Sequence, residues 1–240
     1  MVWDRFDAVL FDLDGVLTPT VEVHMRAWRE LFTAYFTEHG VVPGYTDADY
    51  FADIDGKPRY DGVRATLASR GLHLAEGDPA DPPGAATVCG LGNTKQEIFD
   101  RLLDEGSVAP YPGSITLLDH LAGRGIALGV VSSSRNVRAV LTAAGLAGRF
   151  GVVVDGNMAA AEGLAGKPSA ATFAHAAQAL GVAPERAVVI EDALSGVQAG
   201  RAGGFGLVVG VDRGAAAVQL REAGADVVVH DLAELVEGRP

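Results

Sequence analysis

Residues 6–18, FDAVLFDLDGVLT, decide the fold that this chain is expected to adopt. The apolar run at 8–11 predicts a buried strand, and it ends in two carboxylates, Asp12 and Asp14, followed by Gly15. In an open parallel sheet, ligands bind at the carboxyl ends of the strands. Two carboxylates on one face of a strand, about 4 Å apart, repel each other by roughly 4 kcal/mol at an effective dielectric near 20. The stretch therefore predicts a site in which a cation, a proton or a change of chain direction relieves this repulsion.

The same acidic pattern occurs a second time at residues 53–56 (DIDG), but in a different context. No strand-like run precedes this copy, and it leads into Lys57 and Pro58. A calcium-binding EF-hand loop needs a third oxygen ligand before its glycine and a later glutamate, and neither copy has them. We therefore expect a site at the first copy and none at the second.

Composition limits the classes of partner. The 240 residues are 48% hydrophobic, which is enough for a large core or a core with an inserted domain. The net charge of −12 makes nucleic acid and anionic membranes poor partners. Cys89 is the only cysteine, so no intramolecular disulfide can form, which is typical of a reducing compartment. No apolar run approaches the ~20 residues of a membrane span, and the N-terminus does not read as a signal peptide. We expect a cytoplasmic protein.

The region after the first strand reads as helical. Apolar residues recur at helical spacing over 22–39, and further helices are expected at about 59–70 and 95–105. Residues 77–92, rich in Pro, Gly and Asp, read as a surface loop. Because no strand-like run interrupts it, residues 19–108 are expected to form a helical insertion.

Strands and helices alternate after the Tyr-Pro-Gly turn signal at 111–113. Ser114 is the expected N-cap of the helix that follows and runs to Gly123. Such alternation with continuous apolar strands predicts a parallel sheet covered on both faces. The expected fold is therefore a Rossmann-like, doubly wound α/β core (residues 1–18 and 109–240) with an inserted all-helical cap (19–108). The expected strands cover 126–131, 152–154, 187–190, 207–209 and 227–229, and the expected helices cover 136–144, 170–180, 196–202 and 215–223.

Polar residues follow several of these strands. Asp12 and Asp14 follow the first, the run Ser132-Ser133-Ser134-Arg135-Asn136 follows the second, and Glu191-Asp192 follows the fourth. Lys167 lies before a helix. Each feature alone is better explained by a helix cap, a turn or a surface charge. Together, at one edge of a sheet, they predict phosphoryl transfer.

The residue types fit that chemistry. Converging carboxylates need a hard cation, and Mg²⁺ is commonly held by one or two carboxylates together with a substrate phosphate oxygen. A further carboxylate can then attack phosphorus, while a lysine and a serine hydroxyl share the charge on the transferring oxygens. Asp14 can act as general acid and base.

On these four motifs, Asp12-Leu13-Asp14-Gly15, Ser132, Lys167 and Glu191-Asp192, the chain resembles the haloacid dehalogenase superfamily of phosphatases and phosphomutases. The resemblance covers essentially the whole chain. It implies that Asp12 is the nucleophile, that Asp14 is the acid and base and offers its carbonyl to Mg²⁺, and that Ser132 and Lys167 hold the phosphoryl group. It also implies metal binding by Asp12 and Asp192, with Glu191 in direct contact or one coordination shell out.

Within that superfamily the chain is most similar to the group of beta-phosphoglucomutase and its phosphatase relatives. Thr20, His24 and Trp28 match the hinge and first cap helix of that group. The resemblance implies that Arg59, in Gly56-Lys57-Pro58-Arg59, grips a second substrate phosphate, and that Lys95 faces the site. Ser133, Ser134, Arg135 and Asn136 are similar to its phosphate-binding stretch. The chain departs from the group at Pro19, where the mutase has an aspartate, and in a longer cap loop at 76–90.

The prediction is therefore a Mg²⁺-dependent phosphoryl-transfer enzyme that forms an aspartyl-phosphate at Asp12 and acts on a small sugar phosphate. A phosphomutase is the sharper form of this prediction, and a phosphatase of the same architecture is the alternative. A dehalogenase is less expected because Asp14 would have no role in it. A non-enzymatic metal-binding protein explains the carboxylates but not Ser132 or Lys167. The expected oligomeric state is a monomer or a weak dimer.

Overall fold

The computed structural model of the chain describes residues 2–106, 108–214 and 217–236. The chain divides into two compact units. The sheet unit consists of Met1–Pro19 and Val108–Pro240, and the helical unit consists of Thr20–Ser107.

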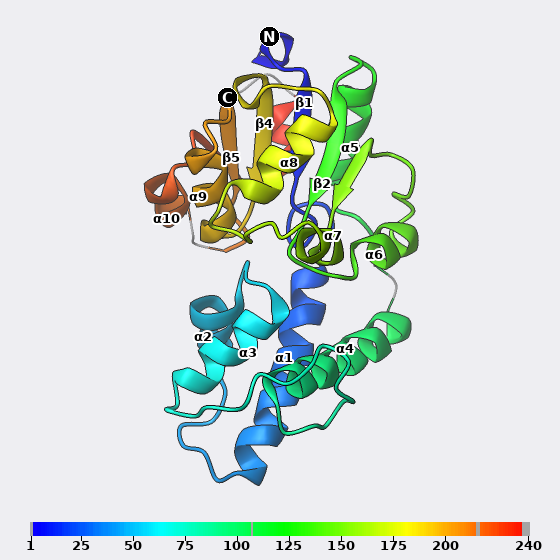
Figure 1. Cartoon of the computed structure of the whole chain (residues 1–240). Coiled ribbons are helices and arrows are strands. Elements are labelled where there is room, and N and C mark those ends of the chain that lie inside the picture. The colour runs from blue at the N-terminus through cyan, green and yellow to red at the C-terminus, as the bar shows by residue number, and fades with distance from the viewer. Residues whose placement is uncertain (1, 107, 215–216, 237–240) are drawn as a thin grey trace. The chain divides into compact units, whose positions relative to one another are not determined.

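The sheet unit is built on six parallel strands in the order β3-β2-β1-β4-β5-β6 (Figure 1). β1 pairs with β2 on one side and β4 on the other, so that Leu10 lies opposite Gly129 and Val189. All four residues of β1 are buried, as expected for a strand covered on both faces. The predicted α/β fold class is confirmed. The strands are β1 (Ala8–Phe11), β2 (Ala127–Val131), β3 (Val152–Val154), β4 (Ala187–Glu191), β5 (Leu207–Val211) and β6 (Val227–Val229).

Helices cover both faces of this sheet. On one face, α8, α9 and α10 pack against the strands around a cluster that includes Leu10, Phe173 and Val208. Leu117 and Leu121 of α5 are fully buried outside that cluster, where α5 packs against β2. The helices of the unit are α5 (Pro112–Ala122), α6 (Val137–Ala143), α7 (Gly156–Ala161), α8 (Ala171–Ala179), α9 (Leu194–Ala202) and α10 (Ala217–Ala223), with short 3₁₀ helices at Val2–Arg5, Pro184–Arg186 and Leu232–Leu235.

The strand order reverses between β1 and β4. From β1 the chain continues outward through β2 and β3, whereas β4, β5 and β6 extend the sheet on the other side. In open α/β sheets, this reversal opens a crevice at the carboxyl ends of the two central strands. The sheet therefore directs the residues that follow β1 and β4 to one place.

Several element boundaries differ from the sequence prediction, and three of these differences have a clear physical reason. Ser114 is not the N-cap of α5, because Tyr111 occupies that position and Pro112 begins the helix. Proline favours the first helical position, since its φ is preset and its missing N–H has no partner there anyway. The Ser114 hydroxyl instead donates to the carbonyl of Val16 at 2.7 Å. The start expected at 215 for the helix that is α10 lies outside the described residues, and α10 is described from Ala217.

The other two differences lengthen an element. β5 continues to Val211 rather than ending at 209. α4 begins at Val88, inside the stretch predicted as a loop, and Thr87 caps it by accepting a hydrogen bond from the Gly90 N–H at 2.9 Å. The prediction of a loop through residue 92 is therefore wrong at its end.

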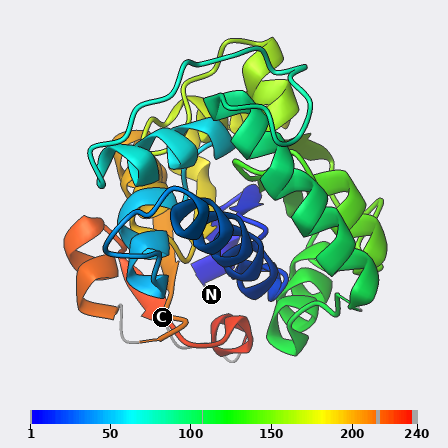
Figure 2. The ribbon, with the colours of Figure 1, turned by 90° about the horizontal axis from the view of Figure 1, so that it is seen from below.

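The regular elements described in the helical unit are helices, with one isolated bridge between Ala75 and Thr87. α1 and α4 pack side by side (Figures 1 and 2). Trp28 and Phe32 stack at 5.6 Å between ring centroids, in a cluster that also includes Val63 and Leu91. No helix among the described residues is long and apolar enough to span a bilayer. The helices are α1 (Thr20–Glu38), α2 (Asp47–Asp49), a π-helix (Tyr50–Ile54), α3 (Arg59–Ala68) and α4 (Val88–Glu105).

Candidate active site

Three buried charged groups meet at the carboxyl edge of the sheet. The Lys167 Nζ lies 2.5 Å from Oδ1 of Asp12 and 2.5 Å from Oε1 of Glu191, and it donates a third hydrogen bond to the Val131 carbonyl at 3.1 Å. Asp12 follows β1, Glu191 ends β4, and Val131 ends β2. Lys167 is 6% exposed, Asp12 7% and Glu191 1%. One ammonium group thus joins the ends of three neighbouring strands.

Glu191 is fixed in this arrangement by its own surroundings. Its second oxygen, Oε2, accepts a hydrogen bond from the Ala193 N–H at 2.9 Å. A Cβ atom at Gly196 would lie 1.8 Å from Oε1, so only glycine leaves room for this carboxylate beside α9. Both oxygens of Glu191 therefore have protein partners, which makes this carboxylate a support for Lys167. We did not single out Gly196 from the sequence.

The charges in this cluster do not balance. Burial raises the pKa of Asp12, the Lys167 ammonium opposes that rise, and the nearby Glu191 and Asp14 carboxylates add to it. The net result is a pKa of Asp12 well above its usual range. Burial works against the charge on Lys167, but Asp12 and Glu191 outweigh it and raise the pKa of Lys167. The lysine is therefore charged, while burial and the neighbouring carboxylates favour the neutral form of Asp12.

Asp14 and Ser132 lie at the ends of adjacent strands. The Ser132 hydroxyl lies 3.5 Å from Oδ2 of Asp14, at the limit of a hydrogen bond, and it accepts one from the Ser134 N–H at 3.1 Å. The turn after Asp14 closes through a hydrogen bond of 2.8 Å from the Gly15 N–H to the Thr18 carbonyl. Two of the four predicted catalytic residues, Asp14 and Ser132, thus face each other, and the other two, Asp12 and Lys167, form the buried ion pair.

Asp192 reaches the same turn from β4. Gly15 has a φ of +83°, and a Cβ atom there would lie 1.8 Å from Oδ2 of Asp192. Glycine adopts this conformation without the steric penalty of other residues and leaves space for the carboxylate. The Asp192 side chain therefore lies against the backbone that directly follows Asp14.

The loop after β2 is held by the segment that follows β3. The Gly156 N–H donates to the Ser134 carbonyl at 2.9 Å, and the Asn157 amide donates to the Arg135 carbonyl at 3.2 Å. A Cβ atom at Gly156 would lie 2.6 Å from the Ser133 carbonyl oxygen. Within the loop, the Ser134 hydroxyl accepts a hydrogen bond from the N–H of Asn136, the residue before α6, at 3.1 Å. The predicted phosphate-binding residues thus form one braced loop. Its supports at 156 and 157 lie just after β3, a strand end to which the sequence prediction assigned no role.

The donor set was tested for its fit to a hard cation. Among residues 2–106, 108–214 and 217–236, no three His, Cys, Asp or Glu side chains form a ready metal site. With Glu191 bound to Lys167 and Ala193, the predicted metal ligands that remain are the carboxylates of Asp12 and Asp192 and the backbone carbonyl of Asp14. Mg²⁺ usually takes one or two carboxylates and completes its shell with substrate phosphate and water. Two carboxylates and one carbonyl fit this pattern of Mg²⁺ coordination.

Four of the predicted substrate-binding residues lie in the helical unit. The Lys95 Nζ lies 2.6 Å from Nδ1 of His24, whose ring stacks on Phe99 at 4.2 Å between centroids. Arg59, the first residue of α3, donates to the side chain of Gln96, the neighbour of Lys95 on α4. His24, Lys95 and Arg59 therefore belong to one connected region of this unit. The fourth residue, Thr20, begins α1.

The second acidic copy has a local structural role. Asp53 lies in the π-helix, and Lys57 donates to the carbonyls of Ala52 and Asp53 at 3.3 and 2.9 Å. Gly56 has a φ of +70° in the turn between them and Pro58. The lysine thus closes a helix end, which accounts for this stretch without a ligand.

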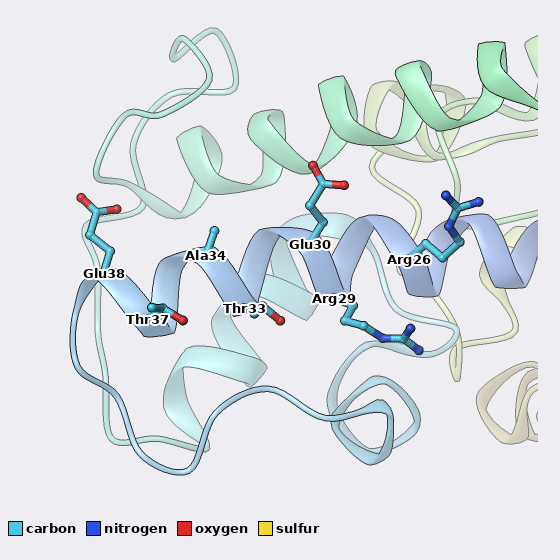
Figure 3. A pocket seen from close by; sticks show the side chains of 7 residues that line it. All are labelled: Arg26, Arg29, Glu30, Thr33, Ala34, Thr37 and Glu38. Atoms are coloured by element: carbon cyan, nitrogen blue, oxygen red, sulfur yellow. The ribbon is translucent and has the colours of Figure 1, made fainter.

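A shallow pocket of the helical unit has none of the predicted site residues in its lining. It runs along one helix, α1, and Figure 3 shows Arg29 and Glu30 leaving that helix on opposite sides. Arg29 pairs with Asp47, and Glu30 pairs with Arg101. Two of its four charged side chains are thus engaged in surface ion pairs, and the whole lining comes from a single helix. Its lining residues are Arg26, Arg29, Glu30, Thr33, Ala34, Thr37 and Glu38.

The chain was compared with known proteins. The model of the haloacid dehalogenase-like hydrolases matches residues 6–204. A Mycobacterium bovis protein named beta-phosphoglucomutase is 47% identical over 97% of this chain and 92% of its own length. The fructose-1-phosphate phosphatase of Escherichia coli is 31% identical over 86% of this chain and 97% of its own length. A crystal structure of a CbbY mutant from Rhodobacter sphaeroides with xylulose-(1,5)bisphosphate superposes with a TM-score of 0.75, at 30% identity and 96% coverage of both chains.

Proposed function

Because the chain belongs to the haloacid dehalogenase-like hydrolases, we propose that it is a Mg²⁺-dependent enzyme that transfers a phosphoryl group of a small sugar phosphate through Asp12. The observation that carries this proposal is the buried Lys167 ammonium between Asp12 and Glu191. A structural ion pair would need only one carboxylate. Here the fully buried Glu191 carboxylate also binds the lysine, while Asp12 lies at the carboxyl end of β1.

Asp12 is the nucleophile in this proposal. Its Oδ1 is bound by Lys167, and no hydrogen bond from the described residues reaches its Oδ2. Oδ2 attacks phosphorus, a bond forms between them, and the bond from phosphorus to the sugar oxygen breaks. Lys167 and the Ser132 hydroxyl stabilise the charge on the remaining phosphoryl oxygens.

Asp14 moves the proton in both half-reactions. In the first, it gives a proton to the departing sugar oxygen, so that the sugar leaves as a neutral hydroxyl. In the second, it takes a proton from the acceptor, whose oxygen attacks phosphorus and breaks the bond to Asp12. The acceptor is water in a phosphatase and a sugar hydroxyl in a mutase.

Asp12, Asp192 and the Asp14 carbonyl would hold Mg²⁺. When bound, the ion would supply positive charge to a site in which the carboxyl groups outnumber Lys167. This fits the raised pKa of Asp12, because the nucleophile must be ionised to attack.

A mutase is the first choice for the acceptor, and the similarity to beta-phosphoglucomutase over nearly the whole chain supports it. The similarity to a fructose-1-phosphate phosphatase supports the alternative, in which water is the acceptor. Both use the same residues of the sheet unit.

Product analysis tests the proposal. The protein is incubated with Mg²⁺, β-glucose 1-phosphate and a trace of glucose 1,6-bisphosphate, and glucose 6-phosphate and free phosphate are measured separately. A mutase forms glucose 6-phosphate faster than phosphate, and a phosphatase forms phosphate. A parallel sample with a labelled phosphodonor is quenched in acid and treated with hydroxylamine, which cleaves an acyl phosphate. Absence of both turnover and a hydroxylamine-sensitive label, also with fructose 1-phosphate as donor, refutes the proposal.

A further inference from the structure

Arg213 contacts the catalytic turn from a strand that the proposed chemistry does not use. It follows β5, and its Nε donates a hydrogen bond of 2.5 Å to the Gly15 carbonyl. Gly15 directly follows Asp14, and Asp192 lies against the same glycine. A cationic donor thus binds the backbone between two carboxylates of the site.

The guanidinium group also holds two other segments. Its central carbon lies 3.8 Å from the centroid of the Tyr111 ring, and its Nη1 donates to the His230 carbonyl at 3.3 Å. Tyr111 in turn donates its N–H to the Leu17 carbonyl at 3.0 Å. The turn after Asp14, the segment before α5 and the segment after β6 therefore meet at one planar side chain.

These contacts lie close to both places where the chain passes between the two units. Pro19, the last residue of the sheet unit before the first crossing, is four residues from Gly15. Val108, the first residue after the second crossing, is three residues from Tyr111. Arg213 thus ties together the parts of the sheet unit that lead into and out of the helical unit.

Gly15 is the position in this turn that most needs an external restraint. Neighbouring positions are fixed from within, since the N–H groups of Leu17 and Thr18 both donate to the Leu13 carbonyl at 2.9 and 3.0 Å. Glycine has no side chain to limit its backbone torsions, so the orientation of its peptide group depends on what its N–H and carbonyl bind. Its N–H is held inside the turn, and Arg213 holds its carbonyl.

From these contacts we infer that Arg213 is a positioning residue for Asp14, which it keeps in reach of the sugar oxygen by fixing the Gly15 peptide. The inference rests on the proposed role of Asp14 as general acid. A misplacement of about 1 Å at a reacting group can lower a rate by ~10²-fold, so a restraint on the turn matters even though Arg213 touches no reacting atom.

The test uses two donors that differ in their need for a proton. A sugar leaves poorly unless Asp14 protonates its oxygen, whereas p-nitrophenolate leaves readily without a proton. Release of the leaving group in a single turnover is therefore measured with β-glucose 1-phosphate and with p-nitrophenyl phosphate. Single turnover isolates the first half-reaction from the second, in which Asp14 also acts.

Arg213→Met keeps the apolar length of the side chain and removes its donors. It is expected to slow transfer from β-glucose 1-phosphate by about 100-fold and from p-nitrophenyl phosphate by less than about threefold. Arg213→Lys keeps the charge but has neither the planar face nor the Nε donor, so it is expected to show the same selective loss. Arg186→Met is the matched control, because Arg186 pairs with Asp7 on the surface at the start of β4.

A loss of equal size on both donors, or no loss on either, overturns the inference. If Arg213→Met does not fold in a urea titration, Tyr111→Leu removes the stacking contact instead, and its loss must be selective in the same way. Asp14→Asn is measured beside them. If Asp14→Asn loses equally on both donors, the proposed role of Asp14 fails. If Asp14→Asn is selective and the Arg213 variants are not, only the inference about Arg213 fails.

Discussion

Replacing Lys167 by methionine should destabilise the fold strongly, because it leaves buried carboxylates without their counter-ion. Lys167 lies 2.5 Å from oxygens of both Asp12 and Glu191. At that separation, each pair attracts by roughly 7 kcal/mol at an effective dielectric of about 20. Loss of hydration on burial offsets much of this, and removal of one partner of a buried pair typically costs about 3–5 kcal/mol. We expect Lys167→Met to lower the free energy of unfolding by that amount.

A second substitution separates this cause from a simple packing defect. Glu191→Gln removes one of the carboxylates that Lys167→Met leaves without a partner. The double variant should therefore be more stable than the sum of the two single losses predicts, by about 1–3 kcal/mol. All four proteins are unfolded in urea at pH 7 with a chelator present, so that bound cations do not contribute.

The deficit of Lys167→Met should also depend on pH. Burial already raises the pKa of Asp12, and Lys167 is the group that opposes the rise. A carboxyl group whose pKa is raised by folding stabilises the fold below its unfolded pKa of about 3.9, and that contribution is lost as the pH rises through the folded pKa. The deficit should then be smaller at pH 5 than at pH 8. Additive losses in the double variant, together with a deficit that does not change with pH, would refute this electrostatic account.

Four further predictions concern activity. Asp12→Asn should lose turnover to below about 1% of the parent, because an amide cannot attack phosphorus, yet in chelator it should unfold at a urea concentration no lower than the parent. Asp14→Asn should lose about 10²- to 10⁴-fold in turnover, as expected for loss of a general acid and base. A chelator should stop turnover of the parent protein until Mg²⁺ is restored. An unchanged rate in chelator would contradict the metal assignment. Arg59→Ala should lower kcat/KM about 30-fold to several thousand-fold for a sugar bisphosphate but less than about threefold for p-nitrophenyl phosphate. Arg101→Ala, which removes an exposed arginine paired with Glu30, is the control for Arg59, and equal losses on both substrates would contradict the second-phosphate role.

The sequence was most informative where apolar runs end in polar residues. The run at 8–11 corresponds residue for residue to β1, and the strands that precede Ser132 and Glu191 lie beside it in the sheet. Parallel strands bring their carboxyl ends to one edge, so the meeting of Asp12 with Glu191 follows from strand order. Their exact partners do not follow. Lys167 and the Ala193 N–H donate hydrogen bonds to the two oxygens of Glu191. The spacing of residues in the sequence does not predict these contacts.

Two of the boundary errors have a common physical cause, which is a glycine used for close packing rather than for a turn. The predicted strand at 207–209 stopped just before Gly210, where a Cβ atom would lie 3.2 Å from Cβ of Leu220 in α10. Gly92 suggested a loop, but it lies in α4 where a Cβ atom would be 2.6 Å from the Tyr60 ring of α3. A glycine inside a regular element can mark such an approach as well as a break. If this strand had been predicted to end at Val211, Arg213 would have been among the residues expected at the ends of the strands.

Whether the acceptor is water or a sugar hydroxyl depends on groups outside the catalytic set. In the proposed mechanism, Asp12, Asp14, Ser132 and Lys167 act on the phosphoryl group and on the proton, and these are the same for both acceptors. A sugar acceptor must therefore be favoured over water by contacts with the rest of the sugar, and only contacts present in the transition state raise its rate. The proposed binding of a second phosphate by Arg59 and Lys95 would supply such a contact, because a second phosphate is the part of a sugar bisphosphate that water lacks.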